Sequence, residues 1–280
     1  MVCKVNTILK HICVIIHFMN IKDPRTYPWK TDSPYEIYAA GRWFGSREDP
    51  AWQNRARRWA ERNSPVYRGE LEASGSSALS LVQELFFLHL TVRGARPEIN
   101  EALDYLKSLE NSRQHLGKKP EDIPFEPAED PDFAIHAWLF CAAVFGQAAG
   151  PAWREVAVRQ GRQVGAADDA WSSGRVYNFL RGTLILPEAE NLPGVVEAIR
   201  ILAARQEPAG FWPDITPWQA YNLLAHSTHP EAARILEKLE PPLLSRQNSD
   251  GSWGSGAQKP LGAFLMAHGL QNRGWFEQKI

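Results

Sequence analysis

Cysteine is scarce in this sequence, and long hydrophobic runs are missing. The 280 residues contain three cysteines, and no two of them form a Cys-x-x-Cys pair. This excludes a disulfide framework or a zinc-finger spacing, and it favours a reducing, cytoplasmic location. The apolar stretch 8–19 is interrupted by a lysine and two histidines. It is shorter than the roughly 20 residues of a membrane span, and no small-residue cleavage site follows it.

The chain also lacks a strong net charge. Lysine and arginine together number 31, aspartate and glutamate 32, and the formal net charge is −1. The nearly neutral net charge therefore creates no overall electrostatic field that would attract nucleic acid or an anionic membrane. We expect no nucleic-acid partner. Peripheral contact with a membrane surface and the oligomeric state are left open.

Proline is abundant, and nine of the 20 prolines predict helix starts. In Ser33-Pro34-x-Glu36 we expect a capping box, with Ser33 as the cap and Glu36 reaching back. Proline lacks the amide that would have no partner in the first turn, so it begins a helix without losing a hydrogen bond. The same logic applies to Pro50, Pro97, Pro131, Pro151, Pro193, Pro217, Pro230 and Pro260.

Two kinds of helix are expected to alternate along the chain. Helices that are apolar nearly all round, and therefore buried, are predicted at 34–44, 77–91, 132–146, 173–185, 217–227 and 260–271. Amphipathic helices with a solvent face are predicted at 50–62, 97–112, 151–164, 193–206 and 230–247. Residues 2–19 or the C-terminal tail could supply a sixth exposed helix. No stretch shows sustained period-two alternation, so strands are expected to be minor at most.

A short motif repeats at the ends of the exposed helices. Gln247 is followed by Asp250-Gly251-Ser252-Trp253, and Gln206 is followed by Gly210-Phe211-Trp212. Looser copies occur at Gln163 with Trp171 and at Gln114. A spacing of roughly 45 residues suits stacked helix pairs.

The ends of the array favour a closed ring. The last buried helix is as apolar as the middle ones, whereas the terminal repeats of an open solenoid carry a polar outer face. The sequence therefore predicts an all-α fold, an (α/α)6 barrel of alternating inner and outer helices. We expect residues 29–280 to form this single domain and residues 1–28 to be an apolar segment and linker packed on it. Alternatively, the natural start is Met19 and the preceding residues are an upstream extension.

The glutamine–tryptophan motifs resemble the repeats of the superfamily of squalene cyclases, class II terpene cyclases and protein prenyltransferase β-subunits. The resemblance covers roughly residues 50–275. It implies the α/α toroid fold and a hydrophobic, isoprenoid-type small molecule as the partner. We interpret the motif residues as structural, because a glutamine amide can bond free groups at helix ends and an indole can cover apolar surface.

The resemblance also implies a candidate acid. Class II cyclases protonate an alkene or epoxide with the middle aspartate of an Asp-x-Asp-Asp motif at the start of an inner helix. Here Asp130 and Asp132 match the first two acids, while Phe133 replaces the third and Ala134 stands where threonine is expected. We predict Asp132 as the proton donor, tuned by Asp130 and by His136, which lies one turn later and could hydrogen-bond Asp132. The alternative is that each aspartate only caps a helix.

Aromatic side chains on the predicted inner helices could form the substrate site. The resemblance implies rings that line a cavity and stabilise carbocations through their π faces. The candidates are Trp138, Tyr177, Trp218, Tyr221, Phe86 and Phe264. The alternative is that these rings simply fill the core.

A metal-binding site has little support in the sequence. Cys141 lies mid-helix without an Asp-x-Cys motif, and Asp168-Asp169 begins a diphosphate–magnesium motif that then fails. His226 and His229 have tolerable metal spacing, but we interpret them as C-terminal helix caps. We expect no metal site and no cofactor, with Mg²⁺ the exception if the substrate is a diphosphate.

Three functions compete at this point. The first is a cyclase-like enzyme, an isomerase or lyase, that cyclises an isoprenoid by acid initiation. The second is a non-catalytic toroid that binds an isoprenoid, a lipid or a protein partner. The third is a different enzyme on the same barrel, such as a polysaccharide lyase that recruits Arg175 and Tyr177. A hollow, apolar interior with Asp132 pointing into it would favour the first.

Overall fold

The structure is a computed structural model that describes residues 21–74, 77–92, 96–111, 122–126, 130–166 and 171–276. It confirms the all-α prediction: within these ranges there are α-helices and 3₁₀ turns, no strand, and one isolated bridge between Trp212 and Ile215. The helices predicted to be buried are α2 (Pro34–Arg42), α4 (Ala78–Thr91), α6 (Phe133–Val144), α8 (Ser173–Thr183), α10 (Pro217–Leu224) and α12 (Lys259–Asn272). Those predicted to be exposed are α3 (Pro50–Asn63), α5 (Pro97–Ser108), α7 (Pro151–Ala166), α9 (Pro193–Arg205) and α11 (Pro230–Leu244). Short 3₁₀ turns connect them: η1 (Pro24–Thr26), η2 (Val66–Arg68), η3 (Leu71–Ser74), η4 (Leu109–Asn111), η5 (Gln147–Ala149), η6 (Pro187–Ala189) and η7 (Gly256–Gln258).

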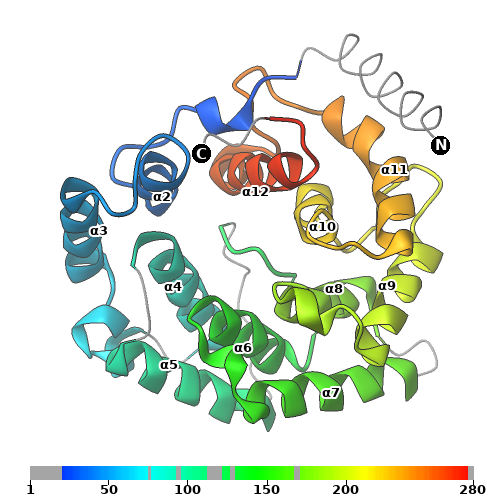
Figure 1. The fold of residues 1–280 in the computed structure, drawn as a ribbon, viewed down its shortest axis with the longest axis horizontal. Coiled ribbons are helices and arrows are strands. Elements are labelled where there is room, and N and C mark those ends of the chain that lie inside the picture. The colour runs from blue at the N-terminus through cyan, green and yellow to red at the C-terminus, as the bar shows by residue number, and fades with distance from the viewer. Residues whose placement is uncertain are drawn as a thin grey trace, which may run out of the picture.

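The even-numbered helices contact one another in succession, from α2 through α12, and α12 contacts α2 (Figure 1). The odd-numbered helices lie outside them, each against its neighbours in the chain. Burial follows this arrangement, because every residue of α6 from Phe133 to Ala142 is buried, whereas α9 buries only one face. The apolar surface of the inner helices is therefore buried on one side against the outer helices. On the other side it is buried against the side chains at the centre of the molecule.

Most predicted proline starts are confirmed, with two corrections. The helix after Asp130-Pro131 begins only at Phe133, because residues 131 and 132 form a turn. The capping box at Ser33 is half formed: its hydroxyl accepts from the Glu36 amide at 3.2 Å, but the Glu36 carboxylate pairs with Arg55 of α3. The opposite charge on α3 offers Glu36 a stronger partner than the Ser33 amide, which donates to the Lys30 carbonyl instead.

The two clear motif copies bond carbonyl groups near helix ends, as the sequence predicted. The Trp212 indole donates to the Leu202 carbonyl at 2.9 Å, and the Trp253 indole donates to the Leu243 carbonyl at the same distance. The Gln206 amide donates to the Gly210 carbonyl at 2.9 Å and to a carbonyl of the next outer helix, that of Ile235, at 3.1 Å. The motif residues are thus structural.

The last copy joins the two ends of the described chain. The Gln247 side chain donates to the Lys22 carbonyl and accepts from the Lys22 amide, each at 2.8 Å. The Arg25 guanidinium lies 5.3 Å from the centre of the Phe276 ring, and η1 packs on α12. Residues 21–26 are therefore fixed to the C-terminal helices. The predictions for residues 1–19, for a sixth outer helix and for the Gln114 copy lie outside the described residues.

Among the described helices, none combines the length and the apolar character needed to cross a bilayer.

Gly210 offers a test of the motif turns. Its φ is +89°, and a Cβ there would lie 2.7 Å from the Lys238 carbonyl oxygen of α11. Gly146 also has a positive φ, of +79°, but a Cβ there would meet nothing within 4 Å. We expect Gly146→Ala to lower the free energy of unfolding by about 1 kcal/mol, the left-handed penalty alone. Gly210→Ala adds a steric clash, so it should cost at least about 2 kcal/mol.

Urea unfolding of both variants measures the difference. Equal losses would show that the turn around Gly210 moves away from α11 without penalty, which would contradict the tight junction described above.

Candidate functional site

Residues 122–126 fill the centre of the ring at the N-terminal ends of the inner helices. Ile123 and Phe125 are fully buried, and the Phe125 ring packs on Phe133 and Phe140 with ring centres 5.8 and 5.5 Å away. Hydroxyl groups of the inner helices bond the backbone of this segment: Tyr35 donates to the Asp122 carbonyl at 3.0 Å and Tyr177 to the Pro124 carbonyl at 2.9 Å. We call these five residues the central segment.

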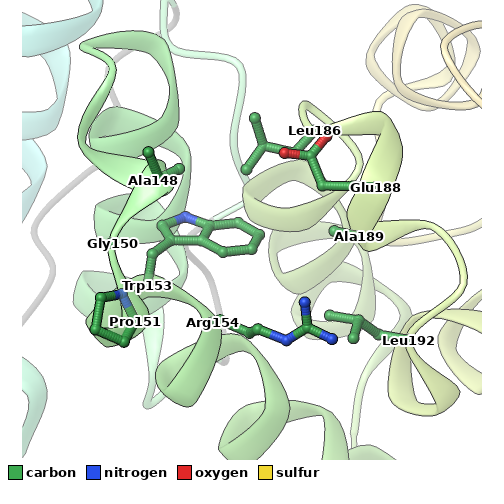
Figure 2. A pocket seen from close by; sticks show the side chains of 10 residues that line it. Ala148, Gly150, Pro151, Trp153, Arg154, Leu186, Glu188, Ala189 and Leu192 are labelled. Atoms are coloured by element: carbon green, nitrogen blue, oxygen red, sulfur yellow. The ribbon is translucent and has the colours of Figure 1, made fainter.

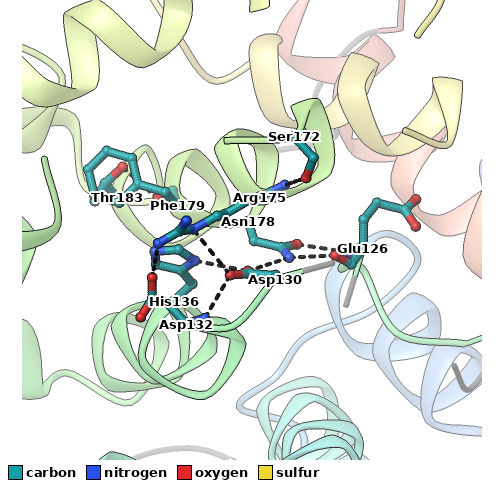
Figure 3. A network of polar contacts seen from close by, with 9 residues as sticks. All are labelled: Glu126, Asp130, Asp132, His136, Ser172, Arg175, Asn178, Phe179 and Thr183. Atoms are coloured by element: carbon teal, nitrogen blue, oxygen red, sulfur yellow. Dashed lines mark hydrogen bonds and ion pairs between the residues drawn. The ribbon is translucent and has the colours of Figure 1, made fainter. Parts of the chain in front are cut away.

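A buried polar cluster, the acid network, lies beside the central segment. It consists of Asp130, Asp132, His136, Arg175 and Asn178 (Figure 3). One Asp130 oxygen accepts from the Asp132 amide at 3.0 Å, and the other accepts from Asn178 at 2.8 Å and lies 2.9 Å from Nδ1 of His136. The Asp132 carboxylate pairs with the Arg175 guanidinium, which lies 4.0 Å from the centre of the Trp171 ring. Both α6 and α8 therefore contribute to one network.

The structure corrects the expected partner of His136. Its Nδ1 bonds Asp130, whereas we predicted a bond to Asp132. Asp130 accepts from the amide of Asp132 in the turn just before α6, and its second oxygen lies against His136. Asp132 instead turns toward α8, where Arg175 lies. Spacing along one helix face could not predict this, because Asp130 stands before the helix.

These contacts leave little room for acid catalysis. An acid that protonates an alkene must present its carboxyl group to the substrate. The Asp130 side chain is fully buried, and both of its oxygens accept from neighbours. Nε of Arg175 lies 3.8 Å from one of these oxygens. The Asp132 side chain is 20% exposed and faces a guanidinium. The arrangement suits two carboxylates that hold α6 and α8 together.

The network continues into the central segment. Asn178 bonds the Glu126 backbone on both sides, accepting from its amide at 2.8 Å and donating to its carbonyl at 2.6 Å. The Glu126 carboxylate accepts from the Thr216 amide at 3.0 Å, at the start of α10. Asp214, which precedes α10, accepts from the Gly174 amide of α8 at 2.8 Å. Asp168 and Asp169 lie outside the described residues.

The six predicted substrate aromatics do not come together. Phe86 and Phe264 line a central pocket described below. Tyr177 bonds the central segment, and Tyr221 donates to Glu240 of α11 at 3.1 Å. Trp138 faces outward, its ring 4.8 Å from the Lys107 ammonium of α5, and half-buried Trp218 packs near Gly254.

A pocket of about 190 Å³ lies between the C-terminal halves of the inner helices. All six inner helices or the residues just after them contribute to this central pocket. Its lining residues are Tyr38, Phe86, His89, Leu90, Phe140, Arg181, Ile185, Asn222, His226, Phe264, Leu265 and His268. The rings of Tyr38 and Phe264 lie edge-to-face with His268, with ring centres 5.3 and 4.8 Å away. The pocket lies at the opposite end of the inner helices from the acid network.

The imidazoles of this pocket are held in their neutral form. Burial, with the positive charges of Arg47 and Arg181, lowers the pKa of His89 to about 4. Burial lowers the pKa of His268 as well, aided by His226, Arg42, Arg181 and His89. The pocket therefore combines aromatic walls, neutral imidazoles and one buried guanidinium, that of Arg181.

A second pocket, of about 240 Å³, opens on the outside of the ring (Figure 2). It is bounded by the residues before α7 and by those between α8 and α9, with the buried Trp153 on one wall. Arg154 and Glu188 point toward it from opposite sides. It contains none of the predicted site residues.

Sequence reasoning missed the polar residues of the central pocket. His89, Arg181 and His268 are polar residues near the C-terminal ends of three inner helices. Polar side chains at these positions, in helices predicted to be buried, were the available signal. The prediction for the His226 and His229 pair was wrong: His229 caps the N-terminus of α11, accepting from the Glu231 amide at 3.2 Å, and His226 lies 2.8 Å from the Asn272 amide.

Within the described ranges, no group of three or more histidine, cysteine, aspartate or glutamate side chains is placed to bind a metal. Neither a protein-family model nor a curated protein matches this chain. The candidate function therefore rests on side-chain geometry.

The acid network predicts that replacing its two aspartates lowers the free energy of unfolding by unequal amounts. Asp130→Asn removes a buried charge that three side chains face, so the free energy of unfolding should fall by about 3 kcal/mol. Asp132→Asn removes one partly exposed ion pair and should cost about 1 kcal/mol. Chemical denaturation of both variants at neutral pH checks this. A larger loss for Asp132→Asn would refute the structural ranking.

The central pocket predicts acid sensitivity. His89 has an ordinary pKa of about 6.5 when unfolded and about 4 when folded, so the unfolded state takes up the proton first as the pH falls. Its contribution is fully present above pH 6.5 and should decline by about 2 kcal/mol by pH 4.5.

His89→Phe removes this proton uptake. The variant should lose less stability than the wild type between pH 6.5 and 4.5, as measured by urea unfolding at several pH values. Equal losses of stability in the variant and the wild type over this pH range would contradict the lowered pKa of His89.

Proposed function

We propose that this chain is an α/α toroid that binds a small molecule in its central pocket without transforming it. The closed succession of inner helices and the two glutamine–tryptophan junctions support the toroid and the resemblance to the cyclase and prenyltransferase superfamily. The observation that carries the binding role is the central pocket, because side chains from all six inner helices converge on it.

The pocket's size limits the ligand. Typical sites for drug-sized ligands measure roughly 300–1,000 Å³, and the central pocket is smaller at about 190 Å³. An engineered cavity of about 150 Å³ takes benzene. A ligand of one ring, or one short branched isoprenoid unit, therefore fits better than a linear triterpene.

The cyclase-like reaction is the alternative. Asp132 supports it, because its side chain is partly exposed at the N-terminus of α6. The fully bonded Asp130, the guanidinium facing Asp132 and the central segment in the N-terminal half of the ring favour the binding role instead. Mg²⁺ would enter only if the alternative acts on a diphosphate.

Two variants at adjacent positions test the binding site. Ile185 lines the central pocket and Leu186 lines the second pocket, and both are half-buried. Ile185→Trp should fill the central pocket and abolish binding of a single-ring probe such as benzyl alcohol, followed by NMR titration. Leu186→Trp should leave binding unchanged. Binding lost only in Leu186→Trp would place the ligand in the wrong pocket and overturn the proposal.

Incubation with prenyl diphosphates or a linear triterpene, with and without Mg²⁺, tests the alternative. We expect no cyclised product by mass spectrometry. A product that disappears in Asp132→Asn, while the protein stays folded, would establish the cyclase instead.

A further inference from the structure

Arg181 is a buried cation without an acidic partner. Only 8% of the residue is exposed, and among the described residues no carboxylate pairs with it. Its guanidinium donates to the Asn222 side-chain oxygen and lies 5.1 Å from the centre of the Phe140 ring, while Nε has no hydrogen-bond partner in the part of the chain described. A buried charge left this way is costly, and burial indeed lowers the Arg181 pKa.

In the part of the chain that the structure describes, the residues around Arg181 in the central pocket carry no negative charge. None of the residues that line the central pocket is an aspartate or a glutamate. The charged groups that act on the pocket imidazoles are Arg42, Arg47 and Arg181, all of them cationic. His226 lies at the exposed rim, whereas His89 and His268 are half-buried. The pocket is therefore apolar in its walls and positive in its field.

Asn222 orients the guanidinium. The Asn222 amide nitrogen donates to the Leu265 carbonyl of α12 at 3.0 Å, which directs its oxygen toward Arg181. One amino group of Arg181 is thereby held, and Nε has no acceptor among the residues that the structure describes. A planar fork of this kind matches two oxygens of one anionic group.

We propose that the ligand of the central pocket is a small organic anion, a single-ring or short-chain carboxylate, whose acid group pairs with Arg181 while its apolar body lies among Phe86, Phe140 and Phe264. This inference rests on the proposed binding function and names the chemistry that the site recognises. The carboxylate supplies the missing counter-charge, and the aromatic rings exclude water from the pair, which strengthens it.

Benzoate and benzamide are matched probes for the full-length protein, since they have nearly the same shape and differ in charge. We expect benzoate to bind at least tenfold more tightly than benzamide by isothermal titration calorimetry at pH 7. Arg181→Met should remove this preference, and Arg181→Lys should restore part of it. Arg154→Gln, at the second pocket, should leave it unchanged.

The outcomes separate the two proposals. If both probes bind equally and Ile185→Trp abolishes both, the binding function stands and the anion inference fails. If neither probe binds, or if Ile185→Trp changes nothing, the proposed function itself fails. Tighter binding of phenyl phosphate, with the same loss in Arg181→Met, supports an organic anion and assigns the acid group to phosphate.

Stability distinguishes a ligand-binding arginine from a structural one. If Arg181 is kept for an anion, Arg181→Met should melt at the same temperature or higher without ligand, because a costly buried charge is gone. If the contacts to Asn222 and Phe140 exist to hold the fold, the melting temperature should fall sharply. That fall, with the benzoate preference retained in Arg181→Lys and Arg181→Met alike, would overturn the proposal.

Discussion

A ring of helices that are buried on most sides must fill its own centre, and the rest of this structure depends on that constraint. The two ends of the ring meet it differently. At the N-terminal ends of the inner helices the chain inserts residues 122–126, with Phe125 in the middle and backbone groups bonded by Tyr35 and Tyr177. At the C-terminal ends only side chains converge, and they leave a space of about 190 Å³. The candidate site therefore lies at the C-terminal ends of the inner helices, where side chains leave this space.

The acid network belongs to the filled end. Its members bond one another and the central segment, and neighbouring Asp214 accepts from the first turn of α8, so these contacts join parts of the fold. Nε of Arg175 and Nε2 of His136 have no hydrogen-bond partner among the described residues, but the Arg175 guanidinium faces a carboxylate. The Arg181 guanidinium of the central pocket has one polar side-chain partner and no carboxylate among the described residues. In proteins, incomplete satisfaction of a buried charge is more informative about a binding role than a dense network.

Local rules predicted the helices well because local chemistry decides them. Proline at a first turn and apolar periodicity gave every described α-helix to within a few residues. The site was harder, since its residues come from six helices and meet only through closure of the ring. Asp130 shows the limit: it stands before its helix, so helix-face spacing could not predict its bond to His136. Likewise, Arg181 and His268 lie on different helices and line one pocket only because the fold brings these helices together.

The bonds between Gln247 and Lys22 bear on how the molecule is made. They connect positions at nearly opposite ends of the described chain, and the last inner helix, α12, contacts the first, α2. During synthesis, helix pairs can form as each emerges, but the ring cannot close until residues beyond Gln247 have left the ribosome. Contacts of such long sequence separation form late. Until then α2 lacks its contact with α12, and apolar surface exposed in this way favours aggregation of the nascent chain.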